Sequence, residues 1–341
     1  MSDVSQTLAL LVLEQVYRGD LVAQINRRSA LLRLLKIVEG AGQNVAWAGR
    51  GDGQLAENYA EGADASNFGS DEQDPAILQW GHYRSNFHVT GTARRTAATS
   101  TTPNAVRNLI GLNFLSASEK LVSLINQSLY TGAGTGTTIA GLDVAVADDT
   151  NTYATIDRSS KSFWRPYVID PGALTALSVA QIRKDIGAIY DQCGENPDIA
   201  VCSTAVFNTV AGLYDNTRRY VQDVVTARGA VRLDAGYQAI EVDGCYFVKD
   251  KDATANRIYY LNSRHVTIEY LPLDVGLMSA LMEMGTTMEA NDGYGNFPLG
   301  IWVEKLAKNG DSDRYQCLTQ LQLKVARPNA CGARLNVATA S

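Results

Sequence analysis

The sequence predicts an α+β fold, and two kinds of pattern predict it. Helical periodicity recurs in the first forty residues, over 102–129 and over 178–194. Strand-like runs lie over 75–95 and over much of 238–325. With 341 residues, of which 45% are hydrophobic, the chain can bury a core that fills one large or two modest domains.

Residues 1–43 are expected to form a helical arm. Apolar residues recur at helical spacing in two runs separated by Gly19, and the second run extends over 21–38. Glycine inside a helix costs about 1 kcal/mol relative to alanine, so the pattern predicts two short helices instead of one rod. Gly40 and Gly42 end the pattern.

Residues 44–99 are expected to form a long two-stranded flap. Their middle is acidic, and on its far side Phe87 and Val89 alternate with polar residues as in a strand. A lone hairpin is only marginally stable in water, so the flap is expected to rest on another subunit. The basic pair Arg94 and Arg95 ends this strand and is either solvated or part of an inter-subunit ion pair.

The best helical signal in the chain follows the flap. Thr102 suits an N-cap, Pro103 suits the first helical position, and Gly132 ends the pattern. About 28 residues at 1.5 Å each give a rod roughly 40 Å long. The residues expected on its apolar face are Val106, Ile110, Phe114, Ala117, Leu121, Leu124 and Leu129.

Helices and strands follow one another in the second half. Ser178 and Gln181 form a capping-box pattern before a helix that ends at Gly194. Its inner face is expected to carry Ile182, Ile186, Ile189 and Tyr190. A buried strand over 199–202 and a helix over 206–213 come next, followed by strands over 238–248, 257–261 and 265–270.

Two strands are predicted near the C-terminus, over 301–306 and 315–325. They flank Asn309-Gly310, which is a good hairpin signal. Alternate residues of the second strand share one face: Tyr315, Cys317, Thr319, Leu321, Leu323 and Val325.

Charge and cysteine content narrow the class of protein. The formal net charge of -6 disfavours a protein whose main task is to grip nucleic acid, because neutralising phosphates requires clustered Lys and Arg. The five cysteines include no Cys-x-x-Cys pair, which indicates a reduced, cytosolic chain. No stretch has the form of a signal peptide or the length of a membrane span.

No constellation predicts catalysis, a metal site or a cofactor. The glycine-rich run over 131–138 lacks the lysine and the preceding strand of a phosphate loop, which favours a helix-exit loop. His82 and His88 are spaced too widely along one strand to favour metal ligation over solvation. Asp143 and Asp148 lack the spacing of a calcium loop and are interpreted as helix-start or turn carboxylates.

The order of these elements resembles the major capsid proteins of tailed bacteriophages, which have the Hong Kong 97-like fold. The strand ending FHVTGTARRTA and the segment YFVKDKDATANRIYYLNSRHVTIEYLP look like that family. The best local match is the segment 141–170, which carries Gly141-Leu142, Tyr153, Ile156-Asp157-Arg158 and Trp164 at positions typical of the family.

The resemblance implies four parts of the chain. They are an N-terminal helical arm (1–43), an extended E-loop that lies over a neighbouring subunit (44–99), a peripheral domain with a spine helix and long strands (100–168 and 311–341) and an axial domain (169–310). The residues expected at inter-subunit contacts are Trp80, Tyr83, Phe87, Arg94, Arg95 and Trp164.

The resemblance also implies a function. The chain is expected to self-assemble as hexamers and pentamers into the icosahedral head that encloses the double-stranded DNA genome of a tailed phage. Expected partners are further copies of the chain, a separate scaffolding protein, a portal protein and, as an option, a decoration protein. No sequence-specific DNA binding, membrane, cofactor or enzymatic activity is expected. The protein should assemble in the host bacterial cytoplasm and end in the virion.

Two departures from the family sharpen this expectation. Some members join their subunits through an E-loop lysine, but this chain has no lysine between Lys36 and Lys120, which predicts a shell without that crosslink. Some members carry a fused scaffold segment, whereas this sequence begins with Met1 and reaches the arm at once, which predicts a separate scaffold or none.

Two alternatives stay open. An encapsulin-like bacterial nanocompartment shell shares the fold and encloses cargo enzymes, although the long acidic flap fits a phage better. An α/β enzyme that uses the helices of 169–310 would belong to another class, and no catalytic constellation supports it.

Overall fold

The computed structural model describes most of the chain and confirms the α+β class. The described residues are 29–51, 56–58, 60–62, 64, 69–70, 72–99, 105–214, 220–221, 223–226, 229–232, 239–272, 298–307 and 310–339. The predicted helices before residue 29, and Thr102 and Pro103, lie outside them. Among the described helices, none is long and apolar enough to cross a membrane.

The first sheet is built around the long strand β18 (Ser312–Val325). On one side, β18 pairs over ten residues with β4, from Gly81↔Leu321 to Thr90↔Ser312. Its other side pairs with β17 and β16, and β16 pairs in parallel with β1. The bounds of these strands are Lys36–Glu39 for β1, Gly81–Thr90 for β4, Val266–Tyr270 for β16 and Trp302–Leu306 for β17.

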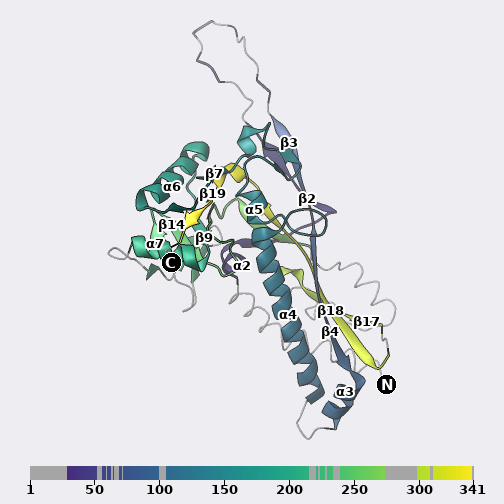
Figure 1. Cartoon of the computed structure of the whole chain (residues 1–341). Helices are drawn as coiled ribbons and strands as arrows, with labels where there is room; N and C mark the ends of the chain where they lie inside the picture. The colour runs from purple at the N-terminus through teal and green to yellow at the C-terminus, as the bar shows by residue number, and fades with distance from the viewer. Residues whose placement is uncertain are drawn as a thin grey trace.

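The second sheet has seven strands in the order β10-β13-β14-β9-β15-β19-β7. Helices α6 (Val179–Cys193) and α7 (Thr204–Leu213) share one hydrophobic cluster with residues of this sheet. The strand bounds are Tyr220–Val221, Ala239–Val242, Cys245–Lys249, Ile199–Cys202, Ile258–Leu261, Gly332–Arg334 and Tyr167–Ile169, in sheet order. Figure 1 shows the two helices beside these strands.

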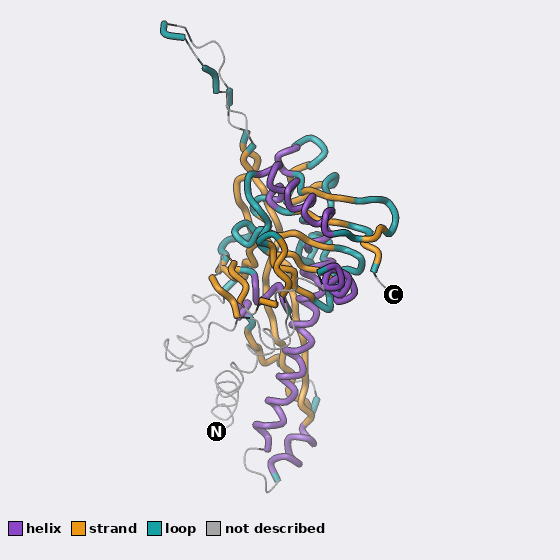
Figure 2. The backbone as a smooth tube through the Cα atoms, turned by 90° about the vertical axis from the view of Figure 1, so that its left-hand side faces the viewer, coloured by secondary structure: helices purple, strands orange, loops and turns teal. Residues whose placement is uncertain are grey.

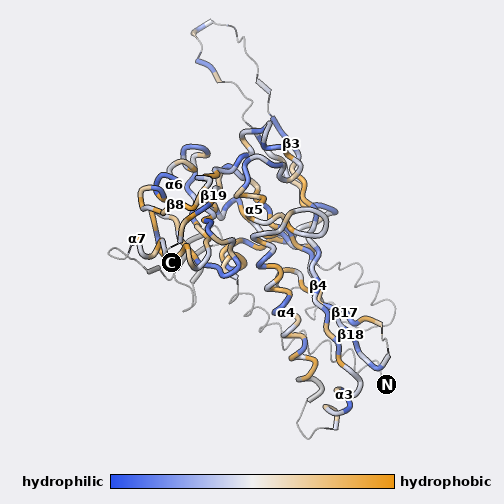
Figure 3. Tube along the Cα trace, viewed as in Figure 1, coloured by the Kyte–Doolittle hydropathy of each residue, from blue (hydrophilic) through white to orange (hydrophobic). Residues whose placement is uncertain are grey.

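Helix α4 (Ala105–Thr131) runs beside β4 and β18 for most of their length (Figure 1). Its hydropathy alternates from turn to turn (Figure 3), because one stripe of the helix faces the sheet. The rings of Phe114 and Phe87 meet edge-on at 6.5 Å, which joins the helix to β4. Helix α3 (Gly91–Ala98) lies alongside α4.

A separate hairpin pairs β2 (Asn44–Arg50) with β3 (Gln73–Gln79). After Trp80 the chain leaves this hairpin and continues as β4, which pairs with β18 and not with β2. The shorter elements are α2 (Ala30–Leu34), α5 (Leu142–Ala145), β5 (Thr152–Tyr153), β6 (Ile156–Asp157), η1 (Ser162–Trp164), β8 (Thr175–Ala176), β11 (Asp223–Thr226), β12 (Gly229–Arg232), η2 (Pro298–Gly300), η3 (Pro328–Ala330) and β20 (Val337–Ala338).

Several local predictions are confirmed. Helix α4 ends at Thr131, directly before Gly132. The capping box of α6 is present, because the Ser178 side chain accepts a hydrogen bond from the backbone of Gln181 and the Gln181 side chain accepts one in return. Strands β17 and β18 form the predicted antiparallel hairpin, and Gly310 in its turn has φ +70°.

Three predictions about the end of the arm and about two helix faces are wrong. Residues 36–39 form a strand instead of continuing a helix, because Leu35 is extended and β16 offers a parallel partner. Leu124 is 45% exposed and Tyr190 is 50% exposed, so neither belongs to an inner helix face. Each lies one residue from a buried isoleucine, and one residue turns the side chain by about 100° around a helix.

Candidate functional site

The hairpin β2–β3 projects from one end of the molecule. Its ladder runs from Asn44↔Gln79 to Arg50↔Gln73, and the described parts of 51–72 lie beyond it, away from the body (Figures 1 and 2). The residues 51–74, here called the acidic segment, contain no lysine or arginine. Their acidic residues are Asp52, Glu57, Glu61, Asp64, Asp71, Glu72 and Asp74.

Aromatic side chains fix the base of this hairpin. Trp47 of β2 lies 6.2 Å from the ring of Trp164, and Trp164 lies 6.3 Å from Tyr153. The Trp47 indole donates a hydrogen bond to the Ala326 carbonyl at 3.2 Å, and Lys324 lies over its ring. The hairpin therefore leaves the body from a packed support next to the end of β18.

Lys161 adds an electrostatic contact at the same place. Its ammonium contacts the Glu72 carboxylate and lies 3.1 Å from Asp74. The hydrogen bonds that its ammonium donates to both carboxylates raise the pKa of Lys161. Because all three side chains are partly exposed, this contact orients the end of the hairpin more than it stabilises the fold.

Four of the residues predicted at inter-subunit contacts are buried within the subunit. Trp80 donates to the Gly42 carbonyl at 3.1 Å, and the Tyr83 hydroxyl accepts a hydrogen bond from the backbone of Ile139. Phe87 stacks on Tyr315 with ring centroids 5.0 Å apart. The fourth, Trp164, is 3% exposed and donates to the Tyr153 carbonyl. All four aromatic side chains therefore pack and form hydrogen bonds or ring contacts within the subunit.

The prediction that Arg94 and Arg95 end a strand is wrong. Strand β4 stops at Thr90, whose hydroxyl accepts a hydrogen bond from the backbone of Ala93 and so caps α3. Both arginines therefore lie on a helix. Arg94 pairs with Asp313 at 2.6 Å and Arg95 with Asp311 at 3.3 Å, so their ion pairs are made within the subunit.

Arg158 is a buried cation whose role the sequence did not reveal. Its side chain is fully buried and donates to the carbonyls of Val144, Ala145 and Asp148. The guanidinium also lies 4.9 Å from the centroid of the Tyr153 ring. Burial lowers the pKa of Arg158 to about 10, which leaves it protonated at neutral pH. Arg158 therefore satisfies carbonyl groups at the C-terminal end of α5.

A second buried network joins the start of the described chain to α4. The Ser29 hydroxyl contacts the Asn126 side chain, and Asn126 donates to Asp250 at 3.1 Å and to Asp252 at 2.6 Å. Asp250 also accepts a hydrogen bond from the backbone of Ala30 at 3.0 Å. No spacing rule could reveal this network, because its members lie about a hundred or more residues apart.

The described residues hold no group of three or more His, Cys, Asp or Glu side chains placed to share a metal ion. His82 and His88 lie exposed on β4. Asp143 accepts hydrogen bonds from Thr254, Arg257 and Tyr259, which ties α5 to the second sheet. Asp148 accepts from Thr150 and Asn151 within a turn, and these bonds lower its pKa against the opposing effect of burial.

Comparison with known families identifies the chain. The sequence profile of the SU10 major capsid protein family matches residues 60–338. The chain belongs to this family. It is a major capsid protein of a bacteriophage, a component of the virion, and the role that its family implies is structural. No curated protein sequence matches the chain.

Solved structures agree with this assignment at the level of fold. The capsid protein of cyanophage A-1(L) has a TM-score of 0.68 at 19% identity, covering 90% of this chain and 91% of that chain. A chain in a structure of Mycobacterium phage Adephagia has a TM-score of 0.54 at 11% identity, covering 92% of each chain. The major capsid protein described here therefore has the Hong Kong 97-like fold.

An encapsulin shell has the same fold. The SrpI encapsulin of Synechococcus elongatus PCC 7942 has a TM-score of 0.56 at 11% identity, covering 91% of this chain and 88% of that chain. The family match favours the phage capsid over the encapsulin interpretation, because that match comes from the sequence and extends over most of the chain.

Proposed function

We propose that this major capsid protein assembles as hexamers and pentamers into the icosahedral head that encloses the double-stranded DNA genome of a tailed phage. The observation that carries the proposal is the family match over residues 60–338. Repetition of modest contacts by symmetry closes such a shell, so no single interface has to be strong. Assembly takes place in the host bacterial cytoplasm, with separate scaffolding and portal proteins as partners.

The proposed parts of the subunit follow the predicted division of the chain except at four strands. Strands β7 and β19 belong to the sheet assigned to the axial domain, and β16 and β17 belong to the sheet of β18. The hairpin within 44–99 is the E-loop that rests on a neighbouring subunit, and its projection from the body supports this role (Figure 1). Helix α4 is the spine of a peripheral domain, and the sheet that carries α6 and α7 is the core of the axial domain. Strands β16 and β17 pair with β18, so we group them with the peripheral domain.

Cryo-electron microscopy of particles purified from cells that produce the protein tests this proposal. Capsomers with five and with six subunits in one closed shell are the expected result. The nucleic acid and protein content of the same particles separates the two kinds of shell. Long double-stranded DNA supports a phage head, whereas a packaged enzyme in place of DNA would support the encapsulin alternative and contradict the proposal.

The subunits of this shell are expected to be held by non-covalent contacts. The chain has no lysine between Lys36 and Lys120, so the E-loop cannot supply a lysine amine for an isopeptide bond. Boiling purified particles in detergent with a reducing agent should release a single band at the 36.8 kDa of the monomer. A ladder of covalent oligomers in that sample would refute this expectation.

A further inference from the structure

Two of the turns where the chain passes from one sheet to the other lie side by side. In the first crossing, residues 262–265 lead from β15 of the second sheet to β16 of the first sheet. In the second crossing, residues 326–331 lead from β18 of the first sheet to β19 of the second sheet. The backbone nitrogen of Ala326 donates a hydrogen bond to the carbonyl of His265 at 2.8 Å, so the two crossings are bonded to each other.

The carboxylate of Glu195 holds both crossings. One of its oxygens accepts hydrogen bonds from the side chains of Asn262 and His265 in the first crossing, each at 2.9 Å. The other oxygen accepts one from Arg327 in the second crossing, also at 2.9 Å. Arg327 donates as well to the carbonyl of Cys193, the last residue of α6, at 3.0 Å. The end of α6 and the two crossings are therefore fixed to one another, and this assembly is here called the junction.

The second crossing also supports the base of the projecting hairpin. The Trp47 indole of β2 donates a hydrogen bond to the carbonyl of Ala326 at 3.2 Å. The ammonium of Lys324, near the end of β18, lies 5.2 Å from the centroid of the Trp47 ring. Ala326 thus bonds the hairpin through its carbonyl and the first crossing through its N–H. The next residue, Arg327, bonds Glu195, so two adjacent residues join the hairpin to the junction.

A groove of about 1000 Å³ lies beside this connection. Ala48, Arg50 and Gly51 line it from the hairpin, and Arg327 and Asn329 line it from the second crossing. Protein interiors are close-packed, and a space of this size leaves one side of the hairpin base without packing contacts that would oppose its movement. The hydrogen bonds and ring contacts of the preceding paragraphs therefore carry much of the connection between hairpin and junction.

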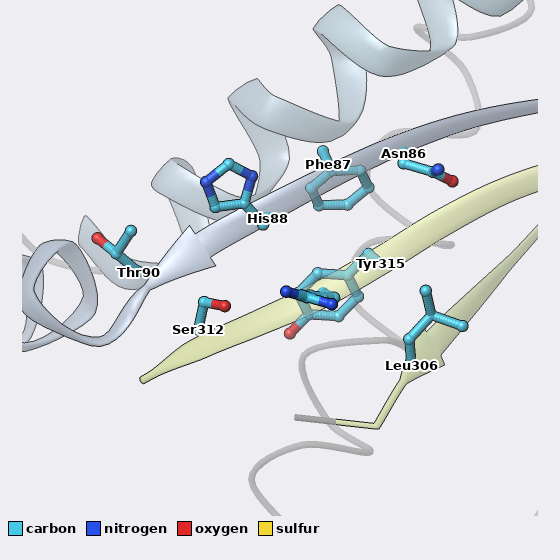
Figure 4. A pocket seen from close by; sticks show the side chains of 8 residues that line it. Asn86, Phe87, His88, Thr90, Leu306, Ser312 and Tyr315 are labelled. Atoms are coloured by element: carbon cyan, nitrogen blue, oxygen red, sulfur yellow. The ribbon is translucent and has the colours of Figure 1, made fainter. Parts of the chain in front are cut away.

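A second groove, of about 520 Å³, has a different position (Figure 4). It is lined from β4, β17 and β18, among others by His88, Thr90, Leu306, Ser312 and Arg314. These three strands all belong to the first sheet. A change in the angle between the two sheets leaves this groove unaltered, so its surroundings offer a control for an experiment on the junction.

We propose that residues 324–327 couple the β2–β3 hairpin to the junction between the two sheets, so that the two loosen and tighten together. Glu195 holds the junction closed, and Trp47 connects its state to the hairpin. A change in the angle between the sheets then alters the direction of the hairpin. Coupling of this kind is reciprocal, so a change that begins at the hairpin also affects the junction. The inference goes beyond the proposed function, because it concerns the single subunit and holds before assembly.

Hydrogen–deuterium exchange of the unassembled subunit at pH 7 tests the inference. Glu195→Ala removes the acceptor for both crossings, and it should raise the exchange rates of the β2–β3 backbone amides by about tenfold or more. Within the described chain, the hydrogen bonds of the Glu195 carboxylate reach none of these amides. A rise confined to 262–265 and 326–331 would show that Glu195 acts locally, and it would overturn the inference.

The reverse experiment covers a Glu195→Ala subunit that does not fold. Trp47→Phe keeps an aromatic ring and removes the donor to Ala326. It should raise the exchange rates of the amides in the first crossing by about threefold or more. The hydrogen bond and ring contacts of Trp47 in the described structure do not include this crossing. Unchanged exchange over 262–265 would contradict the coupling.

Asp311→Ala is the matched control. It removes a carboxylate that pairs with Arg95 at 3.3 Å, directly before β18 and next to Ser312 in the groove of Figure 4. Exchange in β2–β3 and in the first crossing should stay unchanged in this variant. A rise there, or an equal rise in α7 in any of the three variants, would mean that the fold loosens as a whole and would contradict a specific coupling.

Discussion

At the residue scale, buried polar side chains decide how the segments near α5 are held together. The match to the family pattern drew attention to Ile156-Asp157-Arg158, but nothing in the sequence showed what Arg158 contacts. The structure shows a buried guanidinium that satisfies carbonyls of residues just before it in the chain. An arginine offers five donors, which allows one side chain to satisfy several carbonyls at once.

Removing the Arg158 guanidinium should destabilise the subunit. Arg158→Met leaves three carbonyl groups without their donor, and the expected loss is about 3 kcal/mol or more of the free energy of unfolding. Urea unfolding of the unassembled subunit, followed by tryptophan fluorescence, measures it. Arg264→Met, which changes an exposed arginine, should stay within about 0.5 kcal/mol of the unchanged protein. Equal stability of both variants would refute this role for Arg158.

Two glycines should respond in opposite ways to the same substitution. A Cβ at Gly81 would lie 2.6 Å from Ile139 Cγ2 and 2.9 Å from the Ile139 backbone nitrogen, so Gly81→Ala should cost about 1–3 kcal/mol. At Gly187 in α6 a Cβ meets nothing within 4 Å, so Gly187→Ala should stabilise the subunit by up to about 1 kcal/mol. Thermal unfolding of both variants measures the difference, and a stabilised Gly81→Ala would contradict the tight packing at β4.

At the element scale, the sequence predicted those elements whose signals are local. The capping box of α6, the glycine after α4 and the turn before β18 each depend on residues a few positions apart. Strand β1 was missed because its partner β16 lies more than two hundred residues away, and apolar residues alone suit a helix equally well. Helix α3 was missed because its N-cap, Thr90, is also the last residue of strand β4, so no turn residues separate the strand pattern from the helix.

The candidate contact residues show the same limit. Alternation along β4 correctly separated Phe87 and Tyr83 from the polar residues between them, but it could not say which face would meet α4. These aromatic residues therefore pack within the subunit. Arg84 and His88, on the opposite face, are exposed among the residues that the structure describes. Only the position of α4 distinguishes the two faces, and that position is a property of the fold.

Glu195 connects three turns, and it should make their packing depend on pH. Its carboxylate accepts hydrogen bonds from His265, Asn262 and Arg327, all at 2.9 Å. Burial opposes ionisation, but the hydrogen bond and charge of His265 and the charge of Arg327 lower the pKa of Glu195 overall. A carboxyl with a lowered pKa stabilises the fold above its unfolded pKa, near 4.3, and this contribution is lost as the pH falls through the folded value.

The variant Glu195→Gln tests this pH dependence. It should be less stable than the unchanged protein at pH 7, and the difference should shrink as the pH is lowered from about 5 to about 3. Urea unfolding of the unassembled subunit at a series of pH values gives the difference directly. Glu241→Gln on β13 changes an exposed carboxylate and serves as the control. A difference for Glu195→Gln that does not change with pH would contradict the role of the ionised carboxylate.

At the scale of the whole molecule, the order of the elements predicted the family although no single motif did. A hairpin, a long helix, a sheet with helices and long closing strands follow one another as in other capsid proteins, and the family match covers most of that order.

The central claim is that copies of this chain form a closed shell. Negative-stain electron microscopy of the purified protein, with and without co-produced scaffolding protein, tests it most directly. We expect closed shells or rings of capsomers in at least one of the two preparations. A protein that remains a monomer of 36.8 kDa in both, across pH and salt conditions that favour assembly, would contradict the claim.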